Sequence, residues 1–153
     1  MLKDTRSIII ETLVNINFLM MRDRSMVHTQ EQTTHFIKTY TDNYTVLENI
    51  LETKLIPTYY FDRIYYSGQE LVPHTDWEGC EVSVTLQIET TLKSAWDFYV
   101  EGTPIKMEDG DAVIYNGMFA KHWRKPMEGN SKDYHHQIFY ITSYIIVLAI
   151  LLC

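Results

Sequence analysis

The sequence predicts a mainly β protein with helices in its first part, an α+β arrangement in one domain of 153 residues. Two observations predict it. Apolar residues before Pro57 recur near helical spacing, and the chain after Pro57 consists of short aromatic-rich or alternating segments between turn signals. A composition of 46% apolar and 22% charged residues is typical of a globular protein with a substantial core.

Two helices are expected in the first part of the chain. Residues 5–21 are apolar with scattered polar breaks, and residues 29–54 have apolar side chains near helical spacing. Thr29 and Gln32 form a capping-box pattern at the start of the second helix. Its end is expected just before Pro57, because the residue before a proline avoids the helical region.

The remainder of the chain predicts six to eight short strands. The candidate segments are PTYYFDRIYY, LVPHTD, CEVSVTLQIE, WDFYVEG, PIKMEDGDAVIYN, AKHWRKP and HHQIFYI, with turns at Ser67-Gly68 and Asp109-Gly110-Asp111. Turn signals at this short spacing favour a sandwich or barrel over alternating βαβ units. We therefore expect a single domain over 1–153, with helical support over 1–55, a β core over 56–142 and an apolar segment over 143–153.

The charge of the chain bears on its partners. The formal net charge is −7, and the basic residues form no run. Binding to duplex nucleic acid is disfavoured, because it requires a basic face that replaces the counterions of the phosphates. A small-molecule or peptide substrate is compatible with this composition, and the sequence indicates no oligomeric state.

The cysteines and the apolar C-terminal segment bear on localisation. Cys80 and Cys153 do not form a disulfide framework and no secretory signal opens the chain, so the cytoplasm is the expected compartment. Ile138–Cys153 is a run of sixteen uncharged residues, shorter than the about 20 that a membrane-spanning helix needs. A buried last strand followed by an apolar segment is favoured over membrane contact. The alternative is a membrane-tethered interaction protein.

Three residues in the β part form a candidate metal site. His74 and Asp76 are two apart, a spacing that points both side chains to one face if they lie on a strand. His122 follows 46 residues after Asp76, in another expected strand. Two imidazoles and one carboxylate with open positions are the facial triad of non-haem Fe(II) oxygenases. The pair H-x-D is common by chance, and a later histidine in another expected strand makes the pattern more specific.

Over residues 57–140 the chain resembles the small Fe(II)- and 2-oxoglutarate-dependent oxygenases, prolyl 4-hydroxylase-like proteins common in bacteria and phages. The blocks that resemble them are PTYYFDRIYYSGQELVPHTD, CEVSVT, GDAVIYNGMFAKHWRKPMEG and HHQIFY. The resemblance implies a double-stranded β-helix, a jelly-roll or cupin-like barrel, with His74, Asp76 and His122 as catalytic iron ligands. It also implies Fe(II), with 2-oxoglutarate and O₂ as co-substrates. The implied reaction hydroxylates a peptide side chain or small molecule and releases succinate and CO₂.

Several residues are candidates for binding 2-oxoglutarate. Many relatives have an arginine or lysine about ten residues after the second histidine, and this chain has no arginine there. The candidates for co-substrate binding are Arg63, Arg124, Lys132 and His135, with Tyr59 and Tyr65 sharing the strand parity of Arg63. Arginine is better suited than lysine to a two-oxygen clamp, because its guanidinium is a planar fork.

Two other functions share the same metal-binding pattern. The missing arginine leaves open a cupin-like barrel that binds a metal or ligand without oxygenase activity, although cupins usually have H-x-H followed by a glutamate. A zinc hydrolase could use the same donor set. It would need a general base, and Glu78 and Glu81 are near in sequence but belong to no motif.

Overall fold

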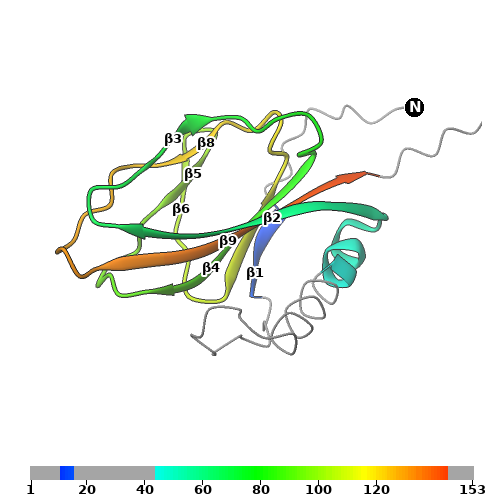
Figure 1. Ribbon diagram of the computed structural model, residues 1–153. Coiled ribbons are helices and arrows are strands. Elements are labelled where there is room, and N and C mark those ends of the chain that lie inside the picture. The colour runs from blue at the N-terminus through cyan, green and yellow to red at the C-terminus, as the bar shows by residue number, and fades with distance from the viewer. Residues whose placement is uncertain (1–10, 16–43, 145–153) are drawn as a thin grey trace, which may run out of the picture.

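The structure is a computed structural model that describes residues 11–15 and 44–144. These residues form two antiparallel sheets and a helical segment, residues 44–51 (Figure 1). The first sheet has the order β1 (Glu11–Asn15), β7 (Asp111–Tyr115), β4 (Val82–Thr90), β9 (Tyr134–Tyr144) and β2 (Leu55–Tyr66). The second has the order β3 (Leu71–His74), β8 (His122–Arg124), β5 (Phe98–Val100) and β6 (Thr103–Ile105). In the described part of the chain these are two open sheets and not a closed barrel.

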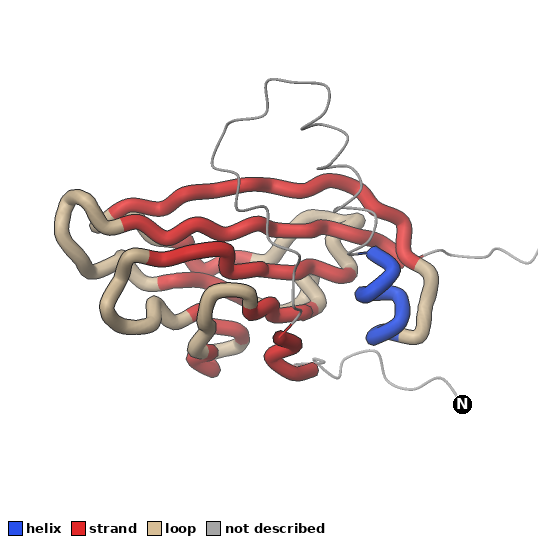
Figure 2. Tube along the Cα trace, turned by 90° about the horizontal axis from the view of Figure 1, so that it is seen from below, coloured by secondary structure: helices blue, strands red, loops and turns tan. Residues whose placement is uncertain are grey.

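The five-stranded sheet is the middle layer of the molecule. One of its faces packs against the helical segment, where Tyr44 and Leu47 join a buried apolar cluster with residues of β2, β4, β7 and β9. The opposite face looks toward the four-stranded sheet, as the layers in Figure 1 show. Seen from below, the helix lies near one end of the long strands (Figure 2). Strands β4 and β7 are therefore buried on both faces, whereas most of β2, at the edge of the sheet, is exposed.

Strand β4 shows how different these two faces are. Val82, Val84 and Leu86 belong to the apolar cluster on the helix side. Successive side chains of a strand alternate between faces, so Ser83, Thr85 and Gln87 point between the sheets, and all three are buried. Buried polar groups require partners. The space between the sheets is therefore partly polar, which an ordinary sandwich core is not.

The mainly β prediction is confirmed. The chain from Leu55 to Tyr144 forms eight strands, β2 to β9, within the predicted range of six to eight. The predicted turns also occur, with Gly68 at φ 84° and Gly110 at φ 94°, backbone conformations that glycine adopts without strain.

The prediction of a helix over residues 5–21 is wrong for residues 11–15. They form β1, which pairs antiparallel with β7 at the edge of the first sheet. Over so short a segment the apolar residues fit the period of a helix and that of a strand equally well. Pairing with the open edge of the sheet makes the segment a strand. The rest of this segment lies outside the described residues.

The second predicted helix ends earlier than expected. Helical residues stop at 51, and Glu52 has a left-handed backbone with φ 50°. The Glu48 carboxylate accepts hydrogen bonds from Lys54 Nζ at 2.6 Å and from Leu55 N at 3.1 Å, which fixes the turn into β2. Pro57 lies inside β2 and does not end the helix. It is tolerated because β2 is the last strand in the sheet order and is irregular at this point. Residues 29–43 lie outside the described residues.

The uncharged C-terminal run begins as a strand, as predicted, because β9 continues to Tyr144. Residues 145–153 lie outside the described residues. Within the described ranges, no helix has both the length and the apolar character needed to cross a membrane.

Candidate metal centre

The two predicted histidine ligands face each other across neighbouring strands. His74 is the last residue of β3 and His122 the first of β8, and the two are paired in register. Their ring centroids are 4.2 Å apart. Both Nε2 atoms lie 3.6 Å from Asp76 Oδ1. One potential ligand atom from each of the three residues lies within 4.8 Å of the others, so the structure brings the predicted triad together.

Asp76 reaches this point from a loop. The H-x-D spacing predicted a strand position, but β3 ends at His74. Asp76 N donates a hydrogen bond to Gly117 O at 2.8 Å, and Ser83 Oγ donates to Asp76 Oδ2 at 2.7 Å. The carboxylate is therefore fixed by the loop after β7 and by β4 of the other sheet. Its second oxygen, Oδ1, is left facing the histidines.

Both imidazoles are oriented in the same way. His74 Nδ1 lies 2.7 Å from Val72 O, and His122 Nδ1 lies 2.9 Å from Ala120 O. A carbonyl oxygen only accepts hydrogen bonds, so each Nδ1 holds a proton, and in the neutral ring Nε2 then has a free lone pair. Fixing the tautomer by a backbone carbonyl is the usual arrangement around histidines that bind metals.

The pKa shifts of His122 and Asp76 suit metal binding, whereas that of His74 favours its charged form in the metal-free protein. Burial lowers the pKa of His122 below its usual value, which favours the neutral ring that a metal requires. Burial opposes ionisation of Asp76, but the hydrogen bond from Ser83 and the nearby His74 and His122 rings outweigh it and lower the pKa of the carboxyl. The nearby Asp76 carboxylate is the main reason that the pKa of His74 is raised. The donor set of two imidazoles and one carboxylate fits Fe(II), and it also fits zinc.

The centre is open on one side. The side chain of His122 is 2% exposed, whereas that of His74 is 35% exposed. Large apolar side chains are exposed in the neighbouring segments: Trp77 follows Asp76, and Phe119 lies two residues after Gly117. A ligand could therefore approach from the side of His74 and meet apolar surface there.

Three of the predicted co-substrate residues lie in the interior beyond His122, together with Gln137. Arg124, Tyr65, His135 and Gln137 are all buried, with exposed fractions of 0 to 1%. Trp96 connects them: its ring centroid is 5.1 Å from the rings of Tyr65 and His135, and the Arg124 guanidinium lies over it at 4.9 Å. We call the four residues and Trp96 the interior polar cluster. The structure thus brings together three of the six predicted co-substrate residues.

The other three candidates lie elsewhere. Arg63 is partly exposed and its guanidinium lies 4.3 Å from the centre of the Tyr65 ring, at the border of the interior polar cluster. Tyr59 is half exposed, with its hydroxyl 3.8 Å from Cys80 Sγ. Lys132 is exposed in the turn before β9, where its N donates to Asn130 Oδ1 at 2.9 Å.

Three residues at the centre were not singled out from the sequence. Ser83 and Gly117 position Asp76, and the buried Tyr115 has its ring centroid 4.7 Å from that of His122. Burial raises the pKa of Tyr115, which keeps the phenol neutral. Two sequence features could have identified Ser83 and Gly117. Ser83 is a polar residue inside a strand of buried character, and Gly117 is a glycine just after such a strand.

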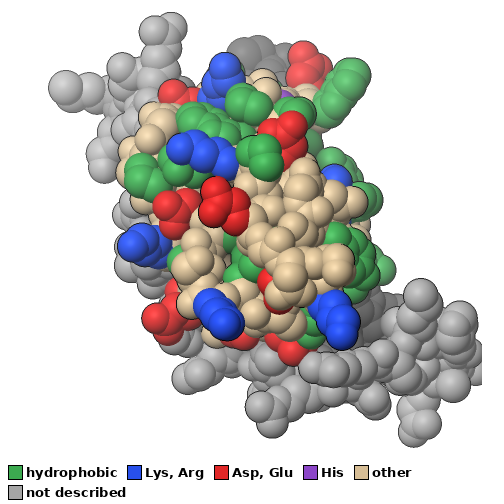
Figure 3. All heavy atoms as spheres, turned by 90° about the vertical axis from the view of Figure 1, so that its left-hand side faces the viewer, with side chains coloured by type: hydrophobic (Ala, Val, Ile, Leu, Met, Phe, Trp, Pro, Cys, Tyr) green, Lys and Arg blue, Asp and Glu red, His purple; other side chains and the backbone are tan. Residues whose placement is uncertain are grey.

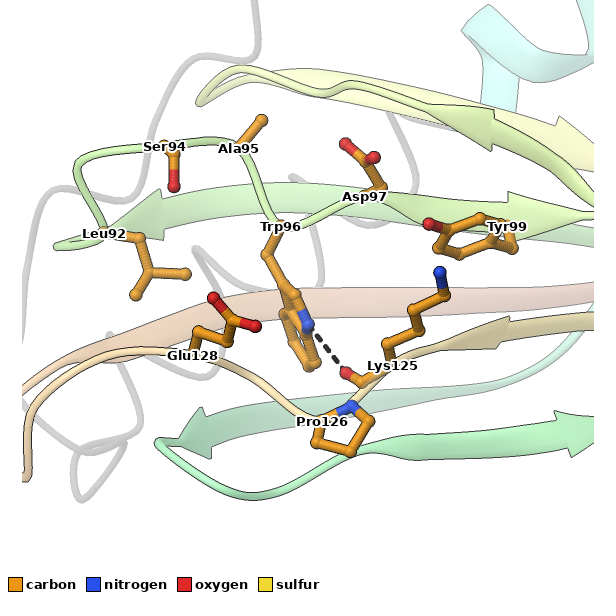
Figure 4. Close-up of a pocket in the computed structure, with 9 residues that line it drawn as sticks. All are labelled: Leu92, Ser94, Ala95, Trp96, Asp97, Tyr99, Lys125, Pro126 and Glu128. Carbon is orange, nitrogen blue, oxygen red and sulfur yellow. Dashed lines mark hydrogen bonds between the residues drawn. The ribbon is translucent and has the colours of Figure 1, made fainter.

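The surface also has a pocket that does not include the triad. Figure 4 shows its lining: Leu92, Ser94, Ala95, Trp96, Asp97, Tyr99, Lys125, Pro126 and Glu128. Trp96 is common to this pocket and to the interior polar cluster, and its Nε1 donates to Lys125 O at 2.8 Å. The pocket therefore borders the cluster at one side chain.

The chain matches no protein-family model, and no curated protein is significantly similar to it.

On the face drawn in Figure 3, Lys and Arg side chains of the described residues lie as separate spots among acidic ones. A functional proposal for this chain therefore rests on the chemistry of the centre formed by His74, Asp76 and His122.

Proposed function

We propose that the protein is a non-haem Fe(II) oxygenase that uses 2-oxoglutarate and O₂, with His74, Asp76 and His122 as the metal ligands. The observation that supports it is the convergence of these three side chains, with both Nδ1 atoms tied to backbone carbonyls. We further propose that the two facing sheets are the halves of a double-stranded β-helix. The position of the triad between a four-stranded and a five-stranded sheet supports this fold.

The proposed reaction balances as substrate C–H, 2-oxoglutarate and O₂ giving the alcohol, succinate and CO₂. Bound Fe(II) would supply the activation of O₂ that no amino-acid side chain provides. The protein supplies the geometry. Ser83 directs one carboxylate oxygen of Asp76 toward the histidines, and Phe98 and Tyr115 pack beside His122 and exclude water from its ring.

The open side of the centre indicates where the substrate would approach. His74 is partly exposed there, and Trp77 and Phe119, with exposed fractions of 87% and 68%, offer apolar contact surface. A peptide side chain or a small molecule with an apolar part suits such a surface. Duplex nucleic acid is disfavoured by the net charge of −7.

Anaerobic titration with Fe(II) and 2-oxoglutarate tests the proposal. The expected result is the weak visible charge-transfer band of the chelate, followed by succinate release when O₂ is admitted. His74→Ala and Asp76→Ala should abolish both signals. The matched control is His136→Ala, because His136 hydrogen-bonds the exposed Asp62 on the outer part of the sheet. A chelate band that persists in both triad variants would refute the ligand assignment.

The same experiment separates the proposal from its alternative. A cupin-like barrel without oxygenase activity would bind the metal through the triad but release no succinate under O₂. The observation that favours this alternative is that the segment about ten residues after His122 contains no arginine, which many members of the resembled family have there.

A further inference from the structure

Strand β2 is an open edge of the five-stranded sheet. Among the described residues it pairs with β9 on one side and has no strand on its other side, and Figure 2 shows it as the outermost long strand. It is 12 residues long, whereas β1 at the opposite edge has 5. In an antiparallel edge strand every second residue points its backbone N–H and C=O away from the sheet, so β2 presents a long row of groups that could bind another strand.

The side chains of β2 are unusually apolar for an exposed edge. Six large apolar side chains are between 42% and 52% exposed: Ile56, Tyr59, Tyr60, Phe61, Ile64 and Tyr66. They lie on both faces of the strand, because successive side chains alternate between faces. A long and apolar edge strand pairs readily with another chain, so an edge of this kind is expected to be covered in the functional protein.

The features that usually prevent edge strands from pairing occur only at one end of β2. Pro57 and the irregularity beside it interrupt the strand near its start. From Tyr59 to Tyr66 the strand pairs with β9 residue for residue, with no proline and no bulge. The two charged side chains of this stretch are engaged within the chain: Asp62 is hydrogen-bonded to His136 at 2.6 Å, and Arg63 lies over a tyrosine ring of the same strand. The stretch Tyr59–Tyr66 is therefore suited to pairing.

We propose that β2 is the interface of a homodimer, in which the β2 strands of two copies pair antiparallel about a two-fold axis perpendicular to the sheet. A second copy supplies a strand of matching length and apolar character, and the pairing closes at two copies because both use the same surface. Such an axis leaves the two sheets facing the same way. Residues on the same face of β2 therefore lie opposite one another across the interface.

The charged residues determine the register of this pairing. A pairing centred on Asp62 would place two carboxylates opposite each other, and one centred on Arg63 would do the same with two guanidinium groups. Like charges directly opposite are destabilising. A pairing centred on Phe61 avoids both arrangements. It places Tyr59 opposite Arg63 of the second copy and Tyr60 opposite Asp62, so a guanidinium meets an aromatic ring and a carboxylate meets a phenol.

The extent of this pairing is enough for a dimer of modest affinity. Centred on Phe61, the pairing overlaps residues 56–66 of both copies, which is nearly all of β2. Half-exposed aromatic side chains leave on the order of 100 Å² each, so the four of each copy and the paired backbone bring the interface to roughly 1,000 Å² in total. This is the lower limit of a specific interface, so we expect the dimer to dissociate on dilution.

Sedimentation velocity of the full metal-free chain over a range of concentrations tests the proposal. The native chain should show a monomer–dimer equilibrium without larger species. Phe61→Lys should weaken the association roughly ten-fold or more, because it places two ammonium groups opposite each other at the axis. Phe119→Lys is the matched control: the same change at another exposed aromatic side chain, outside β2, should leave the association unchanged.

Disulfide formation between copies tests the register and does not require Phe61→Lys to fold. With Phe61→Cys the two thiols lie directly opposite each other, at a Cβ separation of about 4.5 to 5.5 Å that a disulfide can close with a small adjustment. Mild oxidation should therefore link two Phe61→Cys chains well above the level of the native chain. Ile56→Cys is the matched control, because Ile56 is similarly exposed but lies opposite Tyr66 in this register.

The proposal is overturned if the native chain stays monomeric at all concentrations, as it would if another segment of its own chain covered β2. It is also overturned if Phe61→Lys associates like the native chain, or if Phe119→Lys is weakened as much as Phe61→Lys. Equal cross-linking of Phe61→Cys and Ile56→Cys would contradict the register, and with it the proposed pairing. Failure of the metal-binding test leaves the dimer intact, because the residues of this interface include no proposed metal ligand.

Discussion

Gly117 lies directly against Asp76: a Cβ atom added to Gly117 would stand 2.2 Å from Asp76 Oδ2. The same atom would stand 2.2 Å from Ser83 Oγ, which donates its hydrogen bond to that oxygen. The backbone of Gly117 also accepts the hydrogen bond of Asp76 N. The glycine thus allows the loop after β7 to hold Asp76 at both its backbone and its carboxylate.

Gly117→Ala should therefore displace the Asp76 carboxylate. We expect a loss of metal affinity of roughly tenfold or more, and a fall in the free energy of unfolding of about 1 to 3 kcal/mol from overpacking. Fe(II) or Co(II) titration and urea unfolding measure the two effects. Adding Ser83→Ala to Gly117→Ala should recover only part of the stability, because the contact with Asp76 remains. Native metal affinity in Gly117→Ala would show that Asp76 is not held as described.

Ser83→Ala tests the orientation of the carboxylate without overpacking. The variant leaves Asp76 Oδ2 without its 2.7 Å hydrogen bond, so Oδ1 is no longer directed at the histidines. Loss of such an orienting hydrogen bond costs about 10- to 100-fold in metal affinity. Thr85→Ala is the matched control: Thr85 is on the same face of β4 but its hydroxyl pairs with Tyr115 OH. Equal effects of the two substitutions on metal affinity would contradict the role of Ser83.

Much of the β region could be predicted from the sequence because its signals are local. Alternation over Val82–Thr90 and the glycines at positions 68 and 110 define strands and turns without any distant contact. Residues 11–15 could not be predicted in this way. Their strand exists because β7 offers an open edge, and that edge is about a hundred residues away in the chain.

The candidate site could be predicted in part for the same reason. His74 and Asp76 are close in sequence, whereas their meeting with His122 depends on the register of β3 and β8. The roles of Ser83 and Gly117 depend on which atoms of two different sheets come within hydrogen-bond distance. Strand parity correctly put Arg124 on the side of His122, but only the packing of Trp96 and Phe98 around it shows that its charge is buried.

Leu86→Ala tests whether the two faces of β4 contribute independently to stability and to metal binding. Leu86 is 0% exposed and packs in the apolar cluster on the helix side, away from the metal centre. The free energy of unfolding should fall by about 2 to 5 kcal/mol, with unchanged metal affinity at temperatures where the variant is folded. Val72→Ala, at a position with 58% exposure, should change stability by about 0.5 kcal/mol or less. If Leu86→Ala lowers the metal affinity of the folded protein, the two faces of β4 are not independent.

The buried His135 should make the protein sensitive to acid. Burial, aided by the charge of Arg124, lowers the pKa of His135 to about 3. In the unfolded chain a histidine titrates near pH 6.5. Between about pH 6.5 and about pH 3 the unfolded chain therefore binds a proton that the folded protein does not. The free energy of unfolding is retained above this window and is lost as pH falls through it, by up to about 1.4 kcal/mol per pH unit for this group.

His135→Gln removes that proton uptake and keeps a side chain able to hydrogen-bond Gln137. Its free energy of unfolding, measured with urea in the metal-free state from about pH 7 to about pH 5, should fall less steeply than that of the native chain. The difference between the two curves isolates His135 from the carboxylates, which titrate in both proteins. Parallel curves would mean that His135 takes up a proton equally in the folded and unfolded chain, so that its pKa is not lowered by folding.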